Sequence, residues 1–486
     1  MALATQNNLI KSKLTSALLA TVVGTLVLTG CSKEESTNTQ SSSDVSSEAA
    51  ATESRKSSEQ VGDQATVEKL LTSYANMAQA GYEDSLSEAK KLQAAIDTFV
   101  ADPTQANLDA AKVAYKAARQ PYSQTEVFRF DEGFVSANEA RKIGSVDGWE
   151  GQVNAWPLDE ALIDYVSEGY AGEYNSKDNI INSDSITVGS IQQDTKTITP
   201  ELLAEMNEIG GSEANVTTGY HAIEFLLWGQ DTNGVGEGAG NRPFTDYKTD
   251  ASCTSGEGNA SDAAICAKRG DYLKAAAQLL VNDLTDMVGQ WQPGSENTLR
   301  SDLMARSGDN AVRQLFYQMG SLALGELASE RMQVAFVTGS TEDEHECFSD
   351  LTHLSYANNA RGISNVFHGQ YKTVSGQTVG DYGIKQFLID DGQQEAAKML
   401  EAEFDKVTAS FNTIEQKGEN EGIKVDQMIA TAGQVEQQGI SAEQQNERRS
   451  WIESAINDLK SLTDAIEHSA KSMGIDNLDA DGGSKF

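Results

Sequence analysis

The chain has 486 residues and a net charge of −36, from 73 acidic and 37 basic residues. Such a chain repels nucleic acid and anionic lipid headgroups, so we expect no nucleic-acid partner. The length is too great for one core of ordinary size, which predicts two domains.

The first 30 residues have the pattern of an export signal. Two lysines precede the apolar run of residues 18–28, and no acidic residue occurs before Glu34. That order is typical of a secretory signal. The apolar run is too short to remain as a transmembrane helix. We therefore expect residues 1–30 to be a signal peptide.

A lipid anchor is predicted at Cys31. Residues 28–31, Leu-Thr-Gly-Cys, resemble a bacterial lipobox, in which the cysteine is diacylated and becomes the mature N-terminus. Two acyl chains hold a protein stably on a bilayer. Ser32 in the next position favours the outer membrane, by resemblance to Gram-negative lipoproteins. A secretory signal with a chance cysteine is the alternative.

The composition of residues 31–62 predicts that they form a disordered tether. They are mostly Ser, Thr, Glu, Gln and Ala, and Val45 is the one large apolar residue before Val61. Such a composition cannot bury enough apolar surface to fold. The folded body would stand away from the membrane, in the periplasm or at the cell surface.

The rest of the chain has helical periodicity, which predicts an all-α fold of two helical-bundle domains. Thr199 and Pro200 are suited to cap and start a helix that ends at Gly210. The stretch 185–199 has modest β-like alternation and is interpreted as a connection. Further helices are expected near residues 105–120, 270–290, 310–337, 350–371, 393–416 and 441–473.

A glycine-rich stretch at residues 234–264 is predicted to separate the two domains, which would span 63–250 and 262–486. Because export places the protein in an oxidising compartment, Cys253 and Cys266 are disulfide candidates. The short loop that they close is worth about 3 kcal/mol in the chain-entropy model.

Residues 219–229, Gly-Tyr-His-Ala-Ile-Glu-Phe-Leu-Leu-Trp-Gly, contain the candidate site. His221 and Glu224 are three residues apart, so they face the same side of a helix. The neighbours of Glu224 are apolar, and a carboxylate in such surroundings needs a hydrogen-bonding or charged partner. A metal ion or another cation would satisfy it. A structural His-Glu hydrogen bond is the alternative.

The order Gly219-x-His221-x-x-Glu224, followed by Trp-Gly-Gln-Asp and by Arg-Pro-Phe-Thr-Asp-Tyr at 242–247, resembles the signature of the imelysin-like family. Members are bacterial, iron-regulated, surface-anchored helical proteins, and some are described as peptidases. The resemblance covers scattered blocks over residues 65–470. It implies that iron is the favoured metal. One histidine with several carboxylates would also suit zinc, manganese or calcium.

Two upstream blocks also resemble family blocks. The first holds Glu126 and Arg129 among aromatic residues, and the second holds Trp156 and Asp159. If they fold against the central motif, Glu126 and Asp159 would complete an oxygen-rich metal site with His221 and Glu224. Arg129 would neutralise a spare carboxylate. Structural salt bridges are the alternative.

A third family-like block, residues 342–353, is followed by Arg361. Asp350 and His353 are expected beside the site at the domain interface, together with Arg361. Ser349 would suit the cap of the next helix and Asp350 its first turn. The repeated Glu-x-x-His of a di-iron bundle is not matched, because the order is reversed at the central motif.

A zinc peptidase of the common kind needs His-Glu-x-x-His. Ser349 stands where the second histidine would follow His345 and Glu346, and no Gly-x-Ser-x-Gly elbow occurs. We therefore expect a cell-envelope lipoprotein of iron acquisition that binds a metal ion, an iron complex or an iron-uptake protein. A metal-dependent peptidase and a metal-free interaction scaffold are the alternatives.

Overall fold

Helices make up most of the computed structural model, which describes residues 61–129, 143, 145–167, 170, 179–254, 262–476 and 478. The predicted all-α fold is confirmed. The predicted signal peptide, Cys31 and nearly all of the predicted tether lie outside the described residues. No helix among the described residues is long and apolar enough to span a membrane.

The helices are α1 Gln64–Ala101, α2 Gln105–Thr125, α3 Val146–Val153, α4 Glu160–Ile163, α5 Pro200–Met206, α6 Gly219–Trp228, α7 Ala263–Trp291, α8 Leu299–Ala305, α9 Gly308–Gly320, α10 Val334–Thr338, α11 Thr352–His368, α12 Ile384–Asp390, α13 Gln394–Asn420, α14 Val425–Ile429, α15 Ala432–Val435 and α16 Ala442–Ser472. A π-helical segment, Ser321–Gln333, joins α9 to α10. The strands are β1 Ser185–Val188, β2 Ile191–Asp194, β3 Tyr371–Lys372 and β4 Thr378–Val379.

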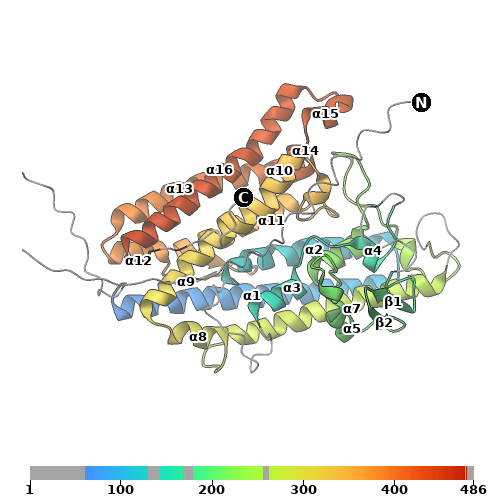
Figure 1. The fold of residues 1–486 in the computed structure, drawn as a ribbon, viewed down its shortest axis with the longest axis horizontal. Helices are drawn as coiled ribbons and strands as arrows, with labels where there is room; N and C mark the ends of the chain where they lie inside the picture. Colours follow the sequence, from blue (N-terminus) through green and yellow to red (C-terminus); the bar gives the residue numbers. More distant parts are fainter. Residues whose placement is uncertain are drawn as a thin grey trace, which may run out of the picture. The chain divides into compact units, whose positions relative to one another are not determined.

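One layer of the fold consists of α1, α2 and α7 running side by side, with α5 and α6 packed on α7 (Figure 1). Helix α1 begins where the Asp63 side chain accepts hydrogen bonds from two backbone N–H groups of the first turn. Its apolar residues recur every three or four positions, so Leu70, Tyr74 and Met77 face the core.

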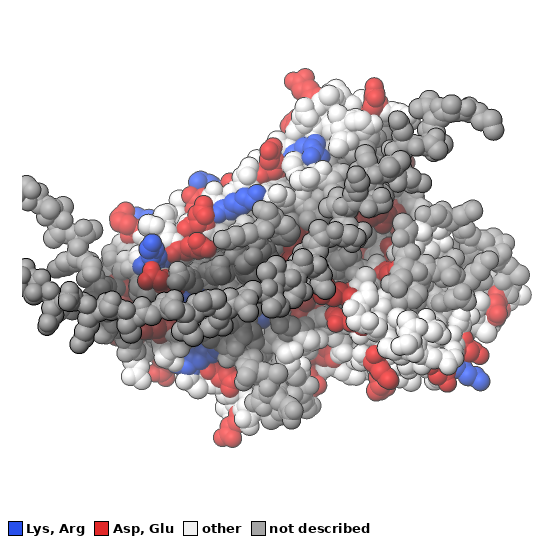
Figure 2. Space-filling view, in the orientation of Figure 1, with Lys and Arg blue, Asp and Glu red and all other residues white. Residues whose placement is uncertain are grey.

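A second layer contains α9, the π-helical segment, α11, α13 and α16 (Figure 1). Helix α16 packs along α13 and the π-helical segment, and α11 packs on both α13 and α2. The pairing of α2 with α11 therefore joins the two layers. Acidic side chains are scattered over the visible face rather than gathered in one patch (Figure 2).

The described residues, from Val61 onward, belong to one compact unit. Helix α7, which the sequence places in the second domain, packs along α1 of the first domain and beside α6. The division into two domains stays a prediction. The segments before and after residues 234–264 therefore contact each other directly, through α7 on one side and α1 and α6 on the other.

The stretch interpreted as a connection forms an antiparallel hairpin of β1 and β2. Ile186 and Val188 are buried while their neighbours are exposed, which is the alternation of a strand with one covered face. Gly189 has a φ of 58°, which a tight two-residue turn requires. The interpretation as a connection is therefore wrong.

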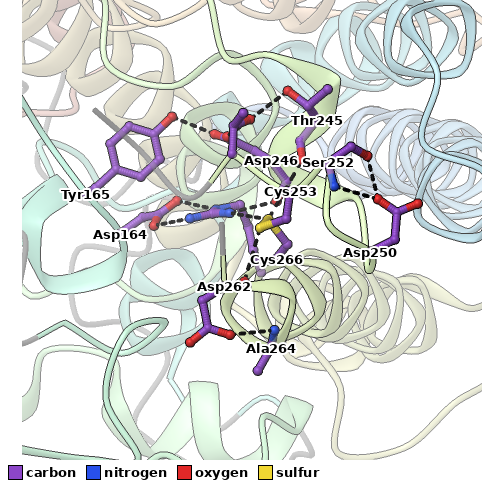
Figure 3. The surroundings of a disulfide bond; sticks show 12 residues. Asp164, Tyr165, Thr245, Asp246, Asp250, Ser252, Cys253, Asp262, Ala264 and Cys266 are labelled. Atoms are coloured by element: carbon purple, nitrogen blue, oxygen red, sulfur yellow. Dashed lines mark hydrogen bonds and ion pairs between the residues drawn. A yellow bond between two sulfur atoms is a disulfide. The ribbon is translucent and has the colours of Figure 1, made fainter. Parts of the chain in front are cut away.

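Cys253 and Cys266 form a disulfide in the structure, as the sequence predicts (Figure 3). Cys266 lies in the first turn of α7, so the bond ties that helix end to the loop before it. Cys347 is a free cysteine. Asp164 and Asp246 lie beside the disulfide in a buried ion-pair cluster, and Tyr165 donates its hydroxyl to Asp246.

Candidate functional site

Helix α6 carries the candidate site, and each of its residues is buried. It begins at Gly219, whose φ of 77° favours glycine. A Cβ at this position would lie 2.4 Å from the carbonyl oxygen of Val153, at the end of α3. The glycine therefore lets the start of α6 approach the end of α3 closely.

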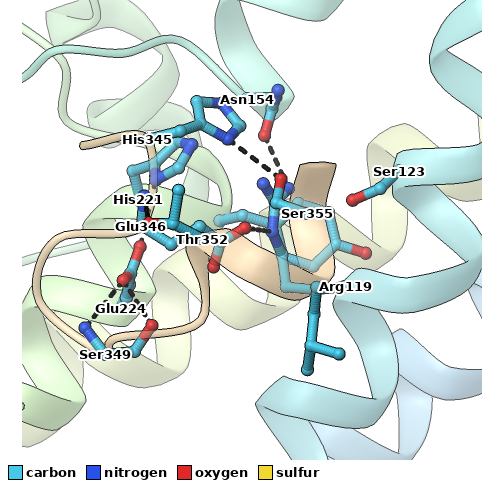
Figure 4. A network of polar contacts seen from close by, with 12 residues as sticks. Arg119, Ser123, Asn154, His221, Glu224, His345, Glu346, Ser349, Thr352 and Ser355 are labelled. Carbon is cyan, nitrogen blue, oxygen red and sulfur yellow. Dashed lines mark hydrogen bonds and ion pairs between the residues drawn. The ribbon is translucent and has the colours of Figure 1, made fainter. Parts of the chain in front are cut away.

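His221 and Glu224 contact each other inside the core. The distance from His221 Nδ1 to Glu224 Oε2 is 3.0 Å, and both side chains are fully buried. Ser349 donates to Glu224 Oε1 from its backbone N–H at 3.0 Å and from its hydroxyl at 2.6 Å (Figure 4). Tyr115 donates its hydroxyl to Glu224 Oε2 at 3.2 Å.

These contacts and the burial of both side chains determine the pKa values of the pair. Burial raises the pKa of Glu224 to about 7, and hydrogen bonds from Ser349 and the charge of Arg119 oppose a larger rise. Burial, reinforced by Arg119, lowers the pKa of His221 to about 3, so its imidazole is neutral. When Glu224 is ionised, Nδ1 of His221 must donate to it, which leaves the lone pair on Nε2. That Nε2 atom is buried and has no partner among the described residues.

A second set of polar groups supports this pair. Arg119 donates from Nε to Glu346 Oε1 at 2.5 Å and from Nη1 to Asn154 Oδ1 at 2.6 Å. Arg119 and Ser123 line a cavity of about 10 Å³. A cavity of that size holds one water molecule. Arg119 Nη2 and Ser123 Oγ are buried and have no protein partner among the described residues.

His345 connects the buried pair to a pocket. Its ring centroid lies 4.8 Å from that of His221 and 5.6 Å from that of Trp156. The pocket has a volume of about 250 Å³. It is lined by Arg129, Glu150, Gly151, Asn154, Ala155, Trp156, Glu208, Glu213, Glu326, Glu330, Arg331 and His345. We call it the acidic pocket, because five of its lining residues are glutamates.

The family model for imelysin, Peptidase M75, matches residues 78–466. The chain belongs to the imelysin family. It is 32% identical over 78 residues to iron-regulated protein A of Synechococcus elongatus, a match that covers 16% of this chain and only 19% of that relative. The activity and partners of that whole relative therefore do not transfer from this match.

Two solved structures share the imelysin fold with this chain. One is from Parabacteroides distasonis and is described as an iron-regulated protein A precursor; it is 14% identical with a TM-score of 0.54. The other is an imelysin-like protein from Psychrobacter arcticum, 15% identical with a TM-score of 0.52. Each match covers 86% of this chain, and 97% and 98% of the two structures.

Glu126 and Asp159, which were predicted upstream of the imelysin motif, contact different partners. Glu126 accepts from Arg331 Nη2 at 2.6 Å and from Asn359 Nδ2 at 3.1 Å. Burial alone would raise the pKa of Glu126, but the charges of Arg331 and Arg129 outweigh it and lower that pKa to about 2. Asp159 caps α4 by accepting from the backbone N–H of Ala161 at 3.2 Å.

Arg129 pairs with Glu326 and, at 3.7 Å, with Glu126. This ion-pair group borders the acidic pocket, since Arg129, Glu326 and Arg331 all line it. Trp156 lines the same pocket and contacts His345. The metal-ligand roles proposed for Glu126 and Asp159 stay predictions.

Two of the residues predicted from the third block, His353 and Arg361, connect α11 to α13. His353 Nε2 lies 2.8 Å from Glu419 Oε1, and Arg361 pairs with Glu415. Asp350 has a φ of 57° and precedes α11 instead of lying in its first turn. The predicted capping role of Ser349 is wrong, because the helix begins at Thr352 and Ser349 donates to Glu224 instead.

The sequence did not identify Tyr115, Arg119, Ser349 or Glu346 as parts of the site. They come from α2 and from the loop before α11, and no spacing rule links them to the imelysin motif. One signal was available: His345 and Glu346 lie in the family-like third block. Among the described residues, no group of three or more His, Cys, Asp or Glu side chains is arranged to hold a metal ion.

Proposed function

We propose that this imelysin-family protein is a cell-envelope lipoprotein of iron acquisition, which receives an iron cation or iron complex as cargo in the acidic pocket. The names of the relatives support an iron-related role. The signal pattern and Cys31 support anchoring in the envelope. The proposal concerns binding, and no catalytic step is assigned.

The observation that carries the proposal is the position of two neutral imidazoles behind a set of glutamates. Glu208 and Glu213 are exposed at the pocket and form no ion pair with other described residues. A pocket lined by five glutamates and two arginines attracts cations. His345 lies in the same lining, with the ring of His221 behind it.

The imidazoles fit a metal cation because both are uncharged. Burial lowers the pKa of His345 well below its usual value, as it does for His221. A metal binds the lone pair of a neutral imidazole, and His221 has such a lone pair on Nε2 when Glu224 is ionised. Glu224 acts here as the group that orients His221, in the way carboxylates orient metal-binding histidines.

The first test is titration calorimetry of the protein with Fe²⁺ under anaerobic conditions, and with Zn²⁺ and Ca²⁺. We expect the double variant Glu208→Gln/Glu213→Gln to bind iron at least about tenfold more weakly. Glu443→Gln/Glu453→Gln on the exposed face of α16 is the matched control, and its affinity should not change. Equal affinities of the two double variants would exclude the acidic pocket as the binding site.

The second test separates the imidazoles from the glutamates. His221→Ala should weaken binding, whereas His468→Ala, at an exposed position on α16, should not. Because His221 is fully buried, the unfolding free energy of each metal-free variant must be measured beside the affinity. No binding of any cation by the unmodified protein would end the proposal that a free iron cation is the cargo, and would leave an iron complex or the metal-free interaction scaffold.

A further inference from the structure

A second pocket lies at the end of α4, and it differs from the acidic pocket in charge. Its volume is about 190 Å³. It is lined by Tyr165, Val166, Ser167, Gly229, Gln230, Thr232, Asn241 and Arg242. None of these residues is acidic, although the chain has 73 acidic residues. Among the described residues of this lining, Arg242 is the one that is charged, so it is the group that could bind an anion.

Arg242 belongs to a buried cluster of two arginines and two aspartates. Its Nη1 donates to Asp164 Oδ2 at 2.7 Å and to Asp246 Oδ2 at 3.3 Å. Arg269 donates to Asp164 from Nε at 2.7 Å and from Nη2 at 2.9 Å. The four formal charges cancel, so the cluster is neutral before any ligand is bound.

The two arginines differ in how many of their guanidinium nitrogens donate a hydrogen bond. Every guanidinium nitrogen of Arg269 has a partner, because Nη1 donates to the carbonyl oxygen of Asp246. In Arg242, both ion-pair contacts fall on Nη1. Its Nε and Nη2 are buried and have no partner among the described residues. Buried donors without a partner cost free energy, which a ligand with matching acceptors would recover.

The two unused nitrogens form the edge of the guanidinium that binds a carboxylate with two parallel hydrogen bonds. Arg269 uses the same edge to bind Asp164. The Arg242 guanidinium is also held in place, with its central carbon 4.9 Å from the centroid of the Tyr165 ring and 5.2 Å from that of Phe225. The edge is therefore preorganised for a planar, two-oxygen group.

Gly229 lies against this side of Arg242. A Cβ at Gly229 would lie 3.2 Å from the Cβ of Arg242 and 3.5 Å from its Nε. Gly229 therefore places backbone and no side chain on this side of Nε, and it lines the pocket itself. Because Nε and Nη2 are buried, a ligand reaches this edge only when the segment from Gly229 to Arg242, which contains no helix or strand, shifts.

We propose that this pocket binds the carboxylate of a small molecule, with its two oxygens on Arg242 Nε and Nη2. A single carboxylate adds one negative charge to a neutral cluster, whereas a phosphate dianion would add two beside Asp164 and Asp246. The volume lies below the roughly 300–1,000 Å³ typical of drug-sized ligands, so the molecule is small. The site shares no lining residue with the acidic pocket.

Replacing Arg242 would break its ion pair with Asp164 and risk unfolding, so the test uses the pocket rim. Thr232 lines the pocket and is exposed. Thr232→Glu puts a carboxylate at the entrance, which repels a ligand carboxylate or occupies its place. Thr232→Gln has nearly the same shape without the charge and serves as the control. Both variants leave the ion-pair cluster intact.

The protein and both variants are titrated by calorimetry with acetate, succinate, citrate and inorganic phosphate at matched ionic strength. We expect saturable binding of at least one carboxylate, weaker binding of phosphate, and a loss of at least about tenfold in Thr232→Glu. Thr232→Gln should bind like the unmodified protein. No carboxylate binding, tighter binding of phosphate, or unchanged affinity in Thr232→Glu would each overturn the proposal.

Discussion

Ser349 donates two hydrogen bonds to one oxygen of Glu224, from its backbone N–H at 3.0 Å and from its hydroxyl at 2.6 Å. The two residues are 125 positions apart in the chain. Their contact joins the loop before α11 to helix α6. It also supplies the donors that a buried carboxylate requires, so the core can contain Glu224 without a paired cation.

The hydroxyl of Ser349 can be removed without enlarging the side chain. We expect Ser349→Ala to lower the free energy of unfolding by about 1–3 kcal/mol, because Glu224 Oε1 loses a donor inside the core. Denaturant unfolding at pH 8 measures the change. Ser461→Ala, at an exposed position of α16, is the control and should stay within about 0.5 kcal/mol. A cost no larger than that of Ser461→Ala would contradict the assigned role.

A comparison of two glycines with positive φ can separate the stability effect of the close approach between α6 and α3 from the effect of backbone strain. Gly219 has a φ of 77° and Gly189 a φ of 58°. A Cβ at Gly189 would meet nothing within 4 Å, whereas at Gly219 it would meet the carbonyl of Val153 at 2.4 Å. We expect Gly219→Ala to cost about 1–3 kcal/mol more than Gly189→Ala, because only the former forces helices apart.

Thermal and denaturant unfolding of these two variants supply the comparison. Equal losses of unfolding free energy would mean that left-handed backbone strain explains both. The structure would then relieve the contact with Val153 at little cost in free energy. A larger loss in Gly189→Ala would place the weak point in the β1–β2 hairpin instead.

The pair His221 and Glu224 could be predicted because it depends only on the geometry of one helical turn. The helical fold could be predicted for a similar reason, since long amphipathic segments have a clear 3.6-residue period. The disulfide followed from the oxidising compartment and from a short separation along the chain. Each of these predictions depends on neighbours in sequence.

The partners of that pair could not be predicted in the same way. Tyr115 and Ser349 reach Glu224 because α2 and the loop before α11 fold against α6, and periodicity carries no information on such long-range contacts. The same holds for His345, whose ring lies beside that of His221 and whose Nδ1 contacts Ser355.

Anchoring by Cys31 is tested by Cys31→Ser. The variant should leave the membrane fraction, because a protein without acyl chains has no stable hold on a bilayer. Fractionation followed by immunoblotting measures this, and circular dichroism of the released protein should show an unchanged helical signal. Membrane association equal to that of the unmodified protein would rule out a lipid anchor at this cysteine.

The peptidase alternative predicts turnover that depends on metal and on Glu224. We expect no zinc-dependent cleavage of unfolded protein substrates, because Glu224 has its oxygens occupied by Ser349, Tyr115 and His221 and is fully buried. Incubation with casein and zinc, with and without a chelator, is the assay. Cleavage that disappears both on chelation and in Glu224→Gln would establish that the protein is a metal-dependent peptidase.

The last prediction concerns acid stability and Glu126. Its pKa is lowered from the usual 4.5 to about 2, because the charges of Arg331 and Arg129 outweigh the effect of burial. A carboxyl whose pKa is lower in the folded state stabilises the fold fully above the unfolded value. That stabilisation is lost as the pH falls from about 4.5 towards 2.

Glu126→Gln should therefore lower the free energy of unfolding by about 3 kcal/mol near pH 7, where it leaves Arg331 buried with one ion-pair partner fewer. The difference from the unmodified protein should shrink as the pH falls from 5 to 3, because the native carboxylate loses its advantage there. Glu453→Gln on α16 is the exposed control and should show no such dependence. Urea unfolding at half-unit pH steps makes the comparison, and a constant difference across this range would show that the Glu126 carboxylate does not stabilise the fold through Arg331.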